Sequence, residues 1–372
     1  MNERCEKPAI ALFIGWLCGG GAEKVLVHLA RGFVARGFSV DFLLLEVKGP
    51  YLSMLPGEVR IVDLGGRSVL RALPRLVGYL RRERPCAMIS SLHRENVYAL
   101  AAKFLSGSDV RLLARVECNL GSLLANERSL LKRLQYRAAS WAYRFADRVI
   151  AVSRGVAVDL QRNRHVKWSK IQCVYNPIVD EDLFRKAEEP VNMPFLADRG
   201  LPLILAVGRL SVQKDYPTLV RAFAGLRKKR PCRLLILGEG EERGAIERMV
   251  HELHLDDDVF MPGFVDNPFA WMKKADLFVL SSAWEGFGNV LVEAMACGVP
   301  AVSTDCPSGP SEILEEGRWG RLVPVGDADA LAAAMEESLA AGKYPDVRSR
   351  AMEFTVDKAV EAHLDLIPEC FR

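Results

Sequence analysis

Short apolar runs alternate with amphipathic segments along almost the whole chain, and this alternation constrains the fold more than any other feature. Runs at 10–16, 39–45 and 87–91 have the length of buried strands. Between them, apolar residues recur at helical spacing, as in 23–36. Strands separated by helices predict βαβ units and a parallel sheet.

The alternation is interrupted once and then repeats. Val174-Tyr175-Asn176-Pro177 reads as a strand end and a turn, and the charged stretch 180–190 follows. Further apolar runs come at 202–207, 232–237 and 277–281. A chain of 372 residues suits two domains. We therefore predict an α/β protein with two Rossmann-like domains, 1–175 and 176–354, whose parallel sheets face each other across a cleft.

The two halves differ sharply in charge. Residues 1–175 hold 28 Lys and Arg against 14 Asp and Glu, while the rest hold 22 against 33. Basic amphipathic helices are expected at 71–84 and 129–146. Solvated helix faces would explain this pattern, and so would an anionic partner. Because no nucleic-acid-binding module is recognisable, we expect docking on an anionic membrane surface and no nucleic acid.

Cysteine usage and hydropathy bear on the compartment. The nine cysteines are scattered, and none forms a Cys-x-x-Cys pair. This pattern favours reduced, buried thiols in a cytosolic protein. No apolar run approaches the about 20 residues of a membrane-spanning helix. We expect a cytoplasmic protein that lies peripherally on the inner face of the cytoplasmic membrane.

Two glycine-containing loops follow predicted strands. Gly19-Gly20-Gly21 precedes a helix, where backbone N–H groups can approach a phosphate, although a tight turn explains it equally well. After the strand 202–207 come Arg209 and Lys214. Two cations at a strand end suit a diphosphate.

The loop 281–290 carries the most specific pattern. It contains two glycines, and Asn289 is expected to cap the helix that follows. Glu285 and Glu293 stand at its edges, with seven residues between them. Carboxylates beside an anion site are costly unless they bind neutral hydroxyls, such as those of a sugar or a ribose.

Taken together, these blocks resemble family 4 glycosyltransferases from about residue 10 to about residue 366. The matching blocks are Gly20-Gly21-Ala22-Glu23, Gly208-Arg209-Leu210 with Lys214, Gly238-Glu239-Gly240, and Glu285-Gly286-Phe287-Gly288-Asn289 with Glu293. The resemblance implies the GT-B fold, with a C-terminal helix in 355–372 that crosses back to the N-terminal domain.

The resemblance also implies an activity. It is metal-independent, retaining transfer of a hexose or N-acetylhexosamine from a nucleotide-diphosphate sugar, without any cofactor. A UDP-sugar is favoured and GDP-mannose stays open. The acceptor would be a glycan or a lipid-linked glycan in cell-surface polysaccharide synthesis.

Roles follow for the matching residues. Arg209 and Lys214 would neutralise the diphosphate, Glu293 would bind the ribose, and Glu285 would bind the donor sugar. Backbone groups next to the sugar and phosphates would belong to Gly20, Gly21, Gly286, Phe287, Gly288, Asn289 and Val290.

Two further residues lie at predicted strand ends. Many relatives carry a histidine where this chain has Arg115-Val116-Glu117, and some bacterial members have a glutamate. Glu117 is therefore expected to contact the donor or acceptor sugar. His93 is also expected to face the cleft, in either a catalytic or a structural role. Asp327-Ala328-Asp329 resembles a metal-binding motif, but helix capping by Asp327 accounts for it.

Other classes remain as alternatives. One is a nucleotide-sugar epimerase of the same fold, and another is a sugar-binding protein without transferase activity. A nicotinamide-dependent oxidoreductase is less favoured because Gly-x-Gly-x-x-Gly is absent.

Overall fold

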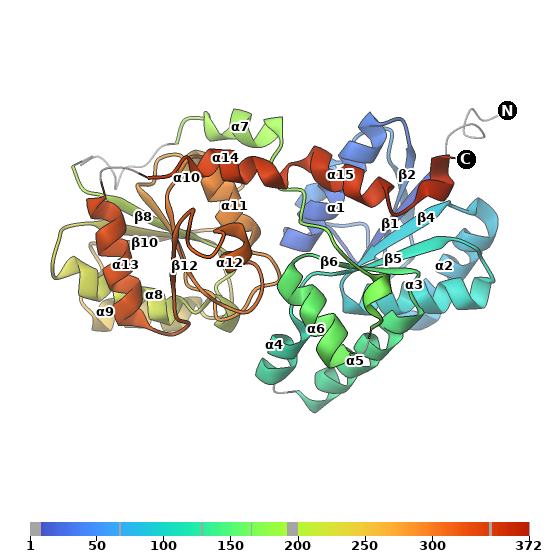
Figure 1. Ribbon diagram of the computed structural model, residues 1–372, viewed down its shortest axis with the longest axis horizontal. Coiled ribbons are helices and arrows are strands. Elements are labelled where there is room, and N and C mark those ends of the chain that lie inside the picture. Colours follow the sequence, from blue (N-terminus) through green and yellow to red (C-terminus); the bar gives the residue numbers. More distant parts are fainter. Residues whose placement is uncertain are drawn as a thin grey trace. The chain divides into compact units, whose positions relative to one another are not determined.

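The computed structural model describes residues 9–66, 68–127, 129–164, 166–191, 200–341 and 344–371. The chain divides into two compact units (Figure 1). Unit 1 consists of Met1–Ile178 and Val356–Arg372, and unit 2 is Val179–Thr355. The C-terminal segment therefore folds with the N-terminal half, and the unit boundaries fall after residues 178 and 355, close to the predicted ones after residues 175 and 354.

The described part of unit 1 contains a seven-stranded parallel sheet in the order β3-β2-β1-β4-β5-β6-β7. Its strands are β1 (Ala9–Ile14), β2 (Ser39–Leu44), β3 (Arg60–Asp63), β4 (Ala87–Ser91), β5 (Arg111–Val116), β6 (Arg148–Ala151) and β7 (Ile171–Cys173). The strand order reverses between β1 and β4, so the loops that follow these two strands border a ligand-binding switch point.

Helices cover both faces of this sheet. Leu12 of β1 packs in one core with α1 (Gly21–Ala35) and α15 (Val356–Leu364), and its neighbour Phe13 packs in another core with α2 (Val69–Glu83) and α3 (His93–Ser106). A Cβ on Gly32 of α1 would stand 2.4 Å from a methyl group of Val360 in α15, so only glycine permits this close approach. The helices of unit 1 are α1 (Gly21–Ala35), α2 (Val69–Glu83), α3 (His93–Ser106), α4 (Leu120–Asn126), α5 (Leu130–Ala142), α6 (Arg154–Arg164) and α15 (Val356–Leu364).

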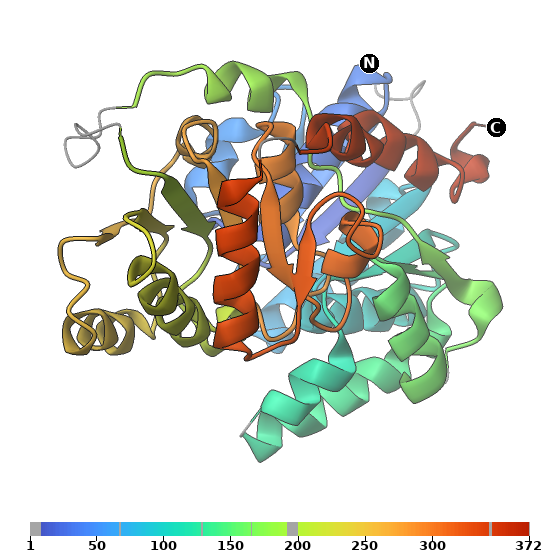
Figure 2. The same ribbon diagram turned by 60° about the vertical axis from the view of Figure 1, so that its left-hand side comes forward.

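The described part of unit 2 repeats the architecture with six parallel strands in the order β10-β9-β8-β11-β12-β13 (Figure 2). The strands are β8 (Leu203–Val207), β9 (Arg233–Leu237), β10 (Val259–Gly263), β11 (Leu277–Leu280), β12 (Ala301–Thr304) and β13 (Arg321–Val323). The helices are α7 (Glu181–Ala187), α8 (Tyr216–Arg227), α9 (Arg243–Glu252), α10 (Pro268–Met272), α11 (Asn289–Ala296), α12 (Pro310–Ile313), α13 (Ala328–Ala340) and α14 (Val347–Ala351). Helices α8, α9 and α13 supply much of one core.

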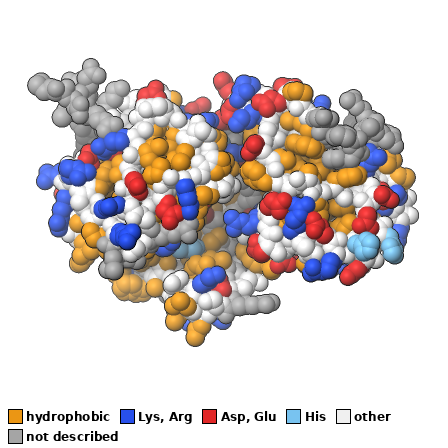
Figure 3. Space-filling view, turned by 180° about the vertical axis from the view of Figure 1, so that it is seen from behind, with side chains coloured by type: hydrophobic (Ala, Val, Ile, Leu, Met, Phe, Trp, Pro, Cys, Tyr) orange, Lys and Arg blue, Asp and Glu red, His pale blue; other side chains and the backbone are white. Residues whose placement is uncertain are grey.

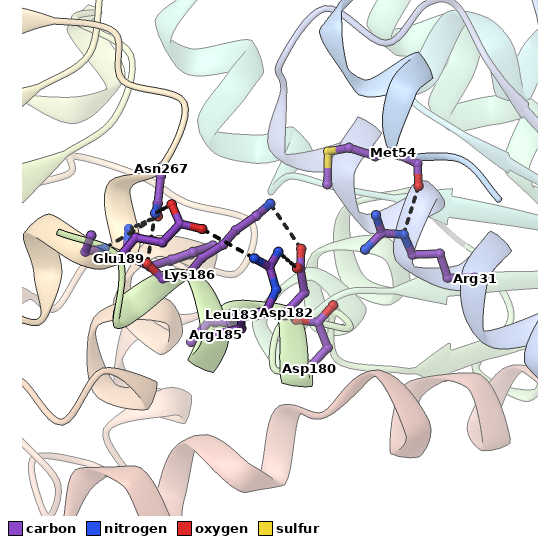
Figure 4. A network of polar contacts seen from close by, with 11 residues as sticks. Arg31, Met54, Asp180, Asp182, Leu183, Arg185, Lys186, Glu189 and Asn267 are labelled. Atoms are coloured by element: carbon purple, nitrogen blue, oxygen red, sulfur yellow. Dashed lines mark hydrogen bonds and ion pairs between the residues drawn. The ribbon is translucent and has the colours of Figure 1, made fainter. Parts of the chain in front are cut away.

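A polar network fastens α7 to α10 within unit 2 (Figure 4). Asn267 caps α10, because its Oδ1 accepts from the amide of Phe269 at 3.1 Å. Its Nδ2 donates to the Lys186 carbonyl and to Glu189 Oε2, both at 2.8 Å. These bonds hold the segment through which the chain enters unit 2 against the start of α10. In unit 1, Arg31 of α1 similarly donates to the Met54 carbonyl at 2.9 Å.

The parallel α/β fold is confirmed, and the differences lie in short elements. Strands β3 and β13 were not predicted because three or four residues at a sheet edge carry too little periodicity. The helix expected at 129–146 ends at Ala142, and a 3-10 turn, η3 (Tyr143–Phe145), follows. Asp327 caps α13 as expected, accepting from the Ala330 amide at 2.8 Å.

The expectation that every cysteine is a free thiol was wrong for one pair. Cys86, just before β4, forms a disulfide with Cys370 near the C-terminus, and their Cα atoms lie 5.5 Å apart. The two residues are 284 positions apart in sequence, so no local spacing could indicate the bond. It closes the C-terminal segment onto the sheet of unit 1.

We expect reduction to destabilise unit 1, because a disulfide across so long a loop typically contributes about 2–4 kcal/mol. Of the nine cysteines, seven should titrate as free thiols in the denatured, unreduced protein. Cys370→Ala should lower the melting temperature as much as a phosphine reductant does, and the reductant should not lower it further. Nine titrating thiols in protein purified without reductant would contradict the bond.

Candidate active site

Two loops of unit 2 meet at one edge of its sheet. The chain leaves β8 at Gly208 and leaves the neighbouring β11 at Ser281. Ser281 Oγ donates to the Lys214 carbonyl at 2.7 Å, and Gln213 Nε2 donates to the Trp284 carbonyl at 2.9 Å. These cross-loop bonds fix the segments that carry the expected site residues.

A buried ion pair joins the two loops. Lys214 Nζ lies 2.5 Å from Glu285 Oε1, and the side chains are only 17% and 8% exposed. Ser282, which is fully buried, donates its hydroxyl to the same carboxylate oxygen at 2.7 Å. The structure thus brings together two predicted site residues, and it adds Ser282 as the group that orients Glu285.

Arg209, the second expected cation, is placed differently. Its side chain is exposed, and it makes no hydrogen bond or ion pair with the part of the chain that the structure describes. The loop therefore carries one cation neutralised by a carboxylate and one cation open to solvent. An incoming anion would be drawn to the second without having to break an existing ion pair.

The loop after Glu285 leads into α11. Gly288, not Asn289, is the N-cap of this helix, and its φ of 101° favours glycine. The capping role expected for Asn289 was therefore wrong: Asn289 is the first helical residue. Glu293 lies one turn further on, with 5% of its surface exposed. The loop is held close to a neighbour, since a Cβ on Gly309 would stand 1.9 Å from the Phe287 carbonyl oxygen.

The Gly238-Glu239-Gly240 block has a structural explanation. A Cβ on Gly238 would lie 2.0 Å from the Gly208 carbonyl oxygen, and one on Gly240 would lie 2.2 Å from that of Leu210. The Leu210 amide donates to the Glu239 carbonyl at 2.9 Å. The block is therefore a backbone support for the loop that carries Arg209.

Two neighbours of Glu285 were missed in the sequence. Burial, and to a lesser extent the charge of Glu285, raise the pKa of Cys306 to about 12. Burial also raises the pKa of Tyr216, whose hydroxyl donates to the Gly208 carbonyl at 3.1 Å. Both side chains stay neutral around neutral pH, so Lys214 supplies the charge that faces Glu285. Single apolar or aromatic positions in a sequence carry no signal of this arrangement.

In unit 1, the glycine loop after β1 is bonded to its own helix. Glu23 Oε2 accepts from the amides of Gly19 and Gly20 at 2.8 and 3.1 Å, in a capping-box arrangement. Two N–H groups of this loop therefore already face a carboxylate. Gly20 is the N-cap of α1 and Gly21 its first residue.

The strand ends of unit 1 carry the other two expected residues. Glu117 Oε1 accepts from Arg115 Nε and from Ser91 Oγ, each at 2.9 Å. His93 Nδ1 lies 2.5 Å from the Tyr143 hydroxyl, and its Nε2 lies 3.2 Å from Cys118 Sγ. Both ring nitrogens of His93 thus contact protein groups, whereas Glu117 keeps Oε2 outside the described hydrogen bonds.

A buried histidine of α15 completes this cluster. Arg115 Nη1 donates to His363 Nε2 at 2.7 Å, and His363 Nδ1 donates to the Ala359 carbonyl at 2.6 Å. Burial, together with the Arg115 charge, lowers the pKa of His363 to about 3. His363 is therefore a neutral hydrogen-bond acceptor at ordinary pH.

Among the described residues, no three His, Cys, Asp or Glu side chains gather as metal ligands would. No helix in the same ranges is long and apolar enough to cross a bilayer.

Comparison with known proteins decides the family. Residues 19–182 match the family described as Glycosyltransferase Family 4, and residues 193–352 match Glycosyl transferases group 1. A relative from Campylobacter jejuni is 30% identical over 87% of this chain and 87% of its own length. It is named N-acetylgalactosamine-N,N'-diacetylbacillosaminyl-diphospho-undecaprenol 4-alpha-N-acetylgalactosaminyltransferase. The chain belongs to glycosyltransferase family 4.

Other members and solved structures agree with this assignment. N-acetyl-alpha-D-glucosaminyl L-malate synthase of Bacillus anthracis is 29% identical over 84% of this chain and 83% of its own length. HepE of Anabaena, solved with UDP and glucose, superposes with a TM-score of 0.80 at 20% identity, covering 96% of this chain and 98% of its own. At that identity the structural match shows the fold alone, which is GT-B.

As a family 4 glycosyltransferase, the chain is a transferase enzyme, and the oxidoreductase alternative is set aside. The matched region in unit 2 includes Arg209, Lys214, Glu285 and Glu293, and the region in unit 1 includes Gly20, Gly21, His93 and Glu117. The two matched regions therefore include, in each unit, the loops after the strands that carry these residues.

The His363 cluster predicts how stability of this glycosyltransferase depends on pH. Between about pH 6.5 and 3 the unfolded histidine binds a proton that the folded one does not, so stability falls as pH falls through that range. The contribution is at most about 1.4 kcal/mol per pH unit. Urea unfolding at pH 7.5, 6 and 5 should show a shallower loss of stability in His363→Gln than in the parent. Equal slopes would contradict the shifted pKa.

Proposed function

We propose that this enzyme is a retaining, metal-independent glycosyltransferase that moves a hexose or N-acetylhexosamine from a UDP-sugar to a glycan or lipid-linked acceptor in cell-surface polysaccharide synthesis. GDP-mannose is the alternative donor. One observation carries the proposal: the β8 loop presents Arg209 without a hydrogen-bond or ion-pair partner among the described residues, on the same loop whose Lys214 is paired with the buried Glu285.

In this proposal the donor diphosphate binds Arg209 and Lys214. Arg209 binds phosphate oxygens in a bidentate way through two N–H groups of its guanidinium. Lys214 interacts with both the diphosphate and Glu285. Glu285, anchored by Ser282, accepts hydrogen bonds from donor-sugar hydroxyls. Glu293 binds the ribose, and the α11 end of the loop faces the sugar and phosphate.

The chemical step follows from this charge arrangement. The bond between the anomeric carbon and the donor phosphate oxygen breaks as the acceptor hydroxyl oxygen attacks the same face of the sugar. The acceptor proton passes to the departing phosphate oxygen, which keeps the configuration at the anomeric carbon. The two cations stabilise the negative charge that grows on the diphosphate, the task that a metal ion performs in other enzymes.

The relatives support the choice of donor and acceptor. The Campylobacter jejuni enzyme is named for an N-acetylgalactosaminyl transfer to a diphospho-undecaprenol glycan. A Rhizobium meliloti relative, 26% identical over 86% of this chain, is named as a lipopolysaccharide core biosynthesis glycosyltransferase. The HepE structure holds UDP. These names favour a uridine nucleotide and an envelope glycan.

We expect UDP, in a panel with GDP, ADP and TDP, to raise the melting temperature by a few degrees, because a ligand that binds only the folded state stabilises it by mass action. The shift should persist in EDTA and disappear in Arg209→Ala. Differential scanning fluorimetry measures it. The control variant is Arg318→Ala, which removes an exposed arginine of unit 2 that is paired with Glu315.

Each outcome of this panel is informative. A shift with GDP alone would change the donor to GDP-mannose, and a shift abolished by EDTA would overturn metal independence. No shift with any nucleotide, in folded protein, would overturn the nucleotide-sugar site. Conversion of a UDP-sugar into its epimer without any acceptor would favour the epimerase.

The acceptor side of the proposal involves an anionic membrane. Helix α5 and the following turn leave apolar side chains unusually exposed: Leu130, Leu131, Leu134, Trp141 and Phe145 are 52–72% exposed. Lys132, Arg133 and Arg137 are exposed on the same helix. Figure 3 shows hydrophobic and basic side chains on the part of unit 1 that carries α4 and α5, at the lower edge of that view. Apolar insertion combined with cations suits an anionic lipid surface at the cytoplasmic face.

The full chain should float with vesicles that contain anionic phosphatidylglycerol at low salt, and not with pure phosphatidylcholine, since each cation near the surface is worth about 1 kcal/mol. Trp141→Ser combined with Phe145→Ser should reduce flotation several-fold. Phe264→Ser is the matched control, because Phe264 is 57% exposed in unit 2. Equal flotation of all three proteins would contradict this docking surface.

A further inference from the structure

A completely buried guanidinium stands at the end of β5. Arg115 has 0% of its surface exposed and is the largest fully buried side chain in the described chain. A charge removed from water in this way is tolerated only where hydrogen bonds replace its hydration. Its partners should therefore be specific and strongly held.

Each nitrogen of Arg115 is bonded to a different segment. Nε donates to Glu117 Oε1 at 2.9 Å, Nη1 to His363 Nε2 at 2.7 Å, and Nη2 to Asn176 Oδ1 at 2.6 Å. Asn176 lies two residues before Ile178, where the first segment of unit 1 ends, and His363 belongs to α15. The planar guanidinium therefore ties the strand end to both segments of chain through which unit 1 continues to unit 2.

The histidine contact is well defined chemically. Arginine can only donate and a carbonyl can only accept, so His363 must carry its proton on Nδ1 and present the Nε2 lone pair to Arg115. A protonated ring would face the guanidinium with a second positive charge. His363 is fully buried, so water cannot replace it as the acceptor.

Glu117 is held by one oxygen. Both Arg115 Nε and Ser91 Oγ donate to Oε1, and Oε2 takes part in none of the described hydrogen bonds. The side chain is 10% exposed. The carboxylate is thus anchored on its inner side, with its other oxygen left for a ligand hydroxyl.

We propose that Arg115 is a positioning residue through which the C-terminal helix α15 and the segment at Asn176 set the orientation of Glu117. The proposal rests on the proposed function and on the expectation, drawn from the family resemblance, that Glu117 contacts the donor or acceptor sugar. It makes sugar transfer depend on how α15 is seated on unit 1. The linkage through Arg115 is rigid, because the three nitrogens of its guanidinium lie in one plane and cannot move independently.

A double-mutant cycle tests the coupling. His363→Gln and Arg115→Lys should each lower kcat for the best UDP-sugar of the donor panel by roughly ten- to a hundredfold, the usual effect of losing a group that orients a ligand-binding side chain. In a Glu117→Ala background, His363→Gln should cause no further decrease. A merely structural role of His363 would lower kcat by the same factor in both backgrounds, which would overturn the proposal.

Arg111→Ala is the matched control. Arg111 lies on the same strand and donates through Nε to the Leu366 carbonyl at 3.0 Å, so it also holds the C-terminal segment but makes no described bond with Glu117. This variant should lose thermal stability comparably to His363→Gln while keeping kcat. An equal fall of kcat in Arg111→Ala would show that any loosening of the C-terminal segment suffices, and it would overturn the role of Arg115.

A measurement that does not depend on sugar transfer separates this inference from the proposed function. Amide hydrogen exchange at residues 115–118 should accelerate in His363→Gln and stay unchanged in Arg111→Ala. If Glu117→Ala kept full activity, the role of Glu117 in catalysis would fail, while the exchange pattern would still decide whether α15 holds the end of β5. Unchanged exchange in His363→Gln would overturn the coupling itself.

Discussion

The buried guanidinium of Arg115 is the constraint on which the assembly of unit 1 depends. Unit 1 is built from two stretches of chain that are separated by the whole of unit 2. An arginine in the interior must satisfy its N–H groups, and here its acceptors come from β5, Asn176 and α15. Losing any one of them leaves a buried charge partly unpaired. The Cys86–Cys370 disulfide and the contact of Gly32 with Val360 hold the same C-terminal segment by other means.

The site in unit 2 rests on a comparable arrangement on a smaller scale. Glu285 is nearly buried, and it is stable there because Lys214 and Ser282 both bond its Oε1. Glycines of neighbouring loops stand where the backbones touch: Gly238 packs against Gly208 in the β8 loop, and Gly309 packs against Phe287 in the β11 loop. Because the strands are parallel, the loops that follow them lie at the same edge of the sheet. The ion pair between Lys214 and Glu285 then joins the two loops and completes the site. Arg209 differs because it is left to solvent, and this difference gives the loop an available cation.

Much of this could be predicted from the sequence, and the failures have physical causes. Segments such as α1, β2 and β9 were predicted within a residue or two of their bounds, because burial imposes their apolar pattern. Strands β3 and β13 are too short to show such a pattern. Asn289 was placed as a cap from its residue type, but the backbone turn at Gly288 takes that position. Ser282, Cys306 and Glu23 matter through contacts that residue type alone does not reveal.

The sequence by itself determined the α/β class, the two-domain organisation and the family, since these depend on periodicity and on local blocks such as Glu285 to Glu293. Only the tertiary structure decided which groups face one another: Lys214 with Glu285, Arg115 with His363, and Cys86 with Cys370. The physical reason is sequence separation. Contacts between residues that are 71, 248 or 284 positions apart arise from packing of whole elements, and no local preference encodes them.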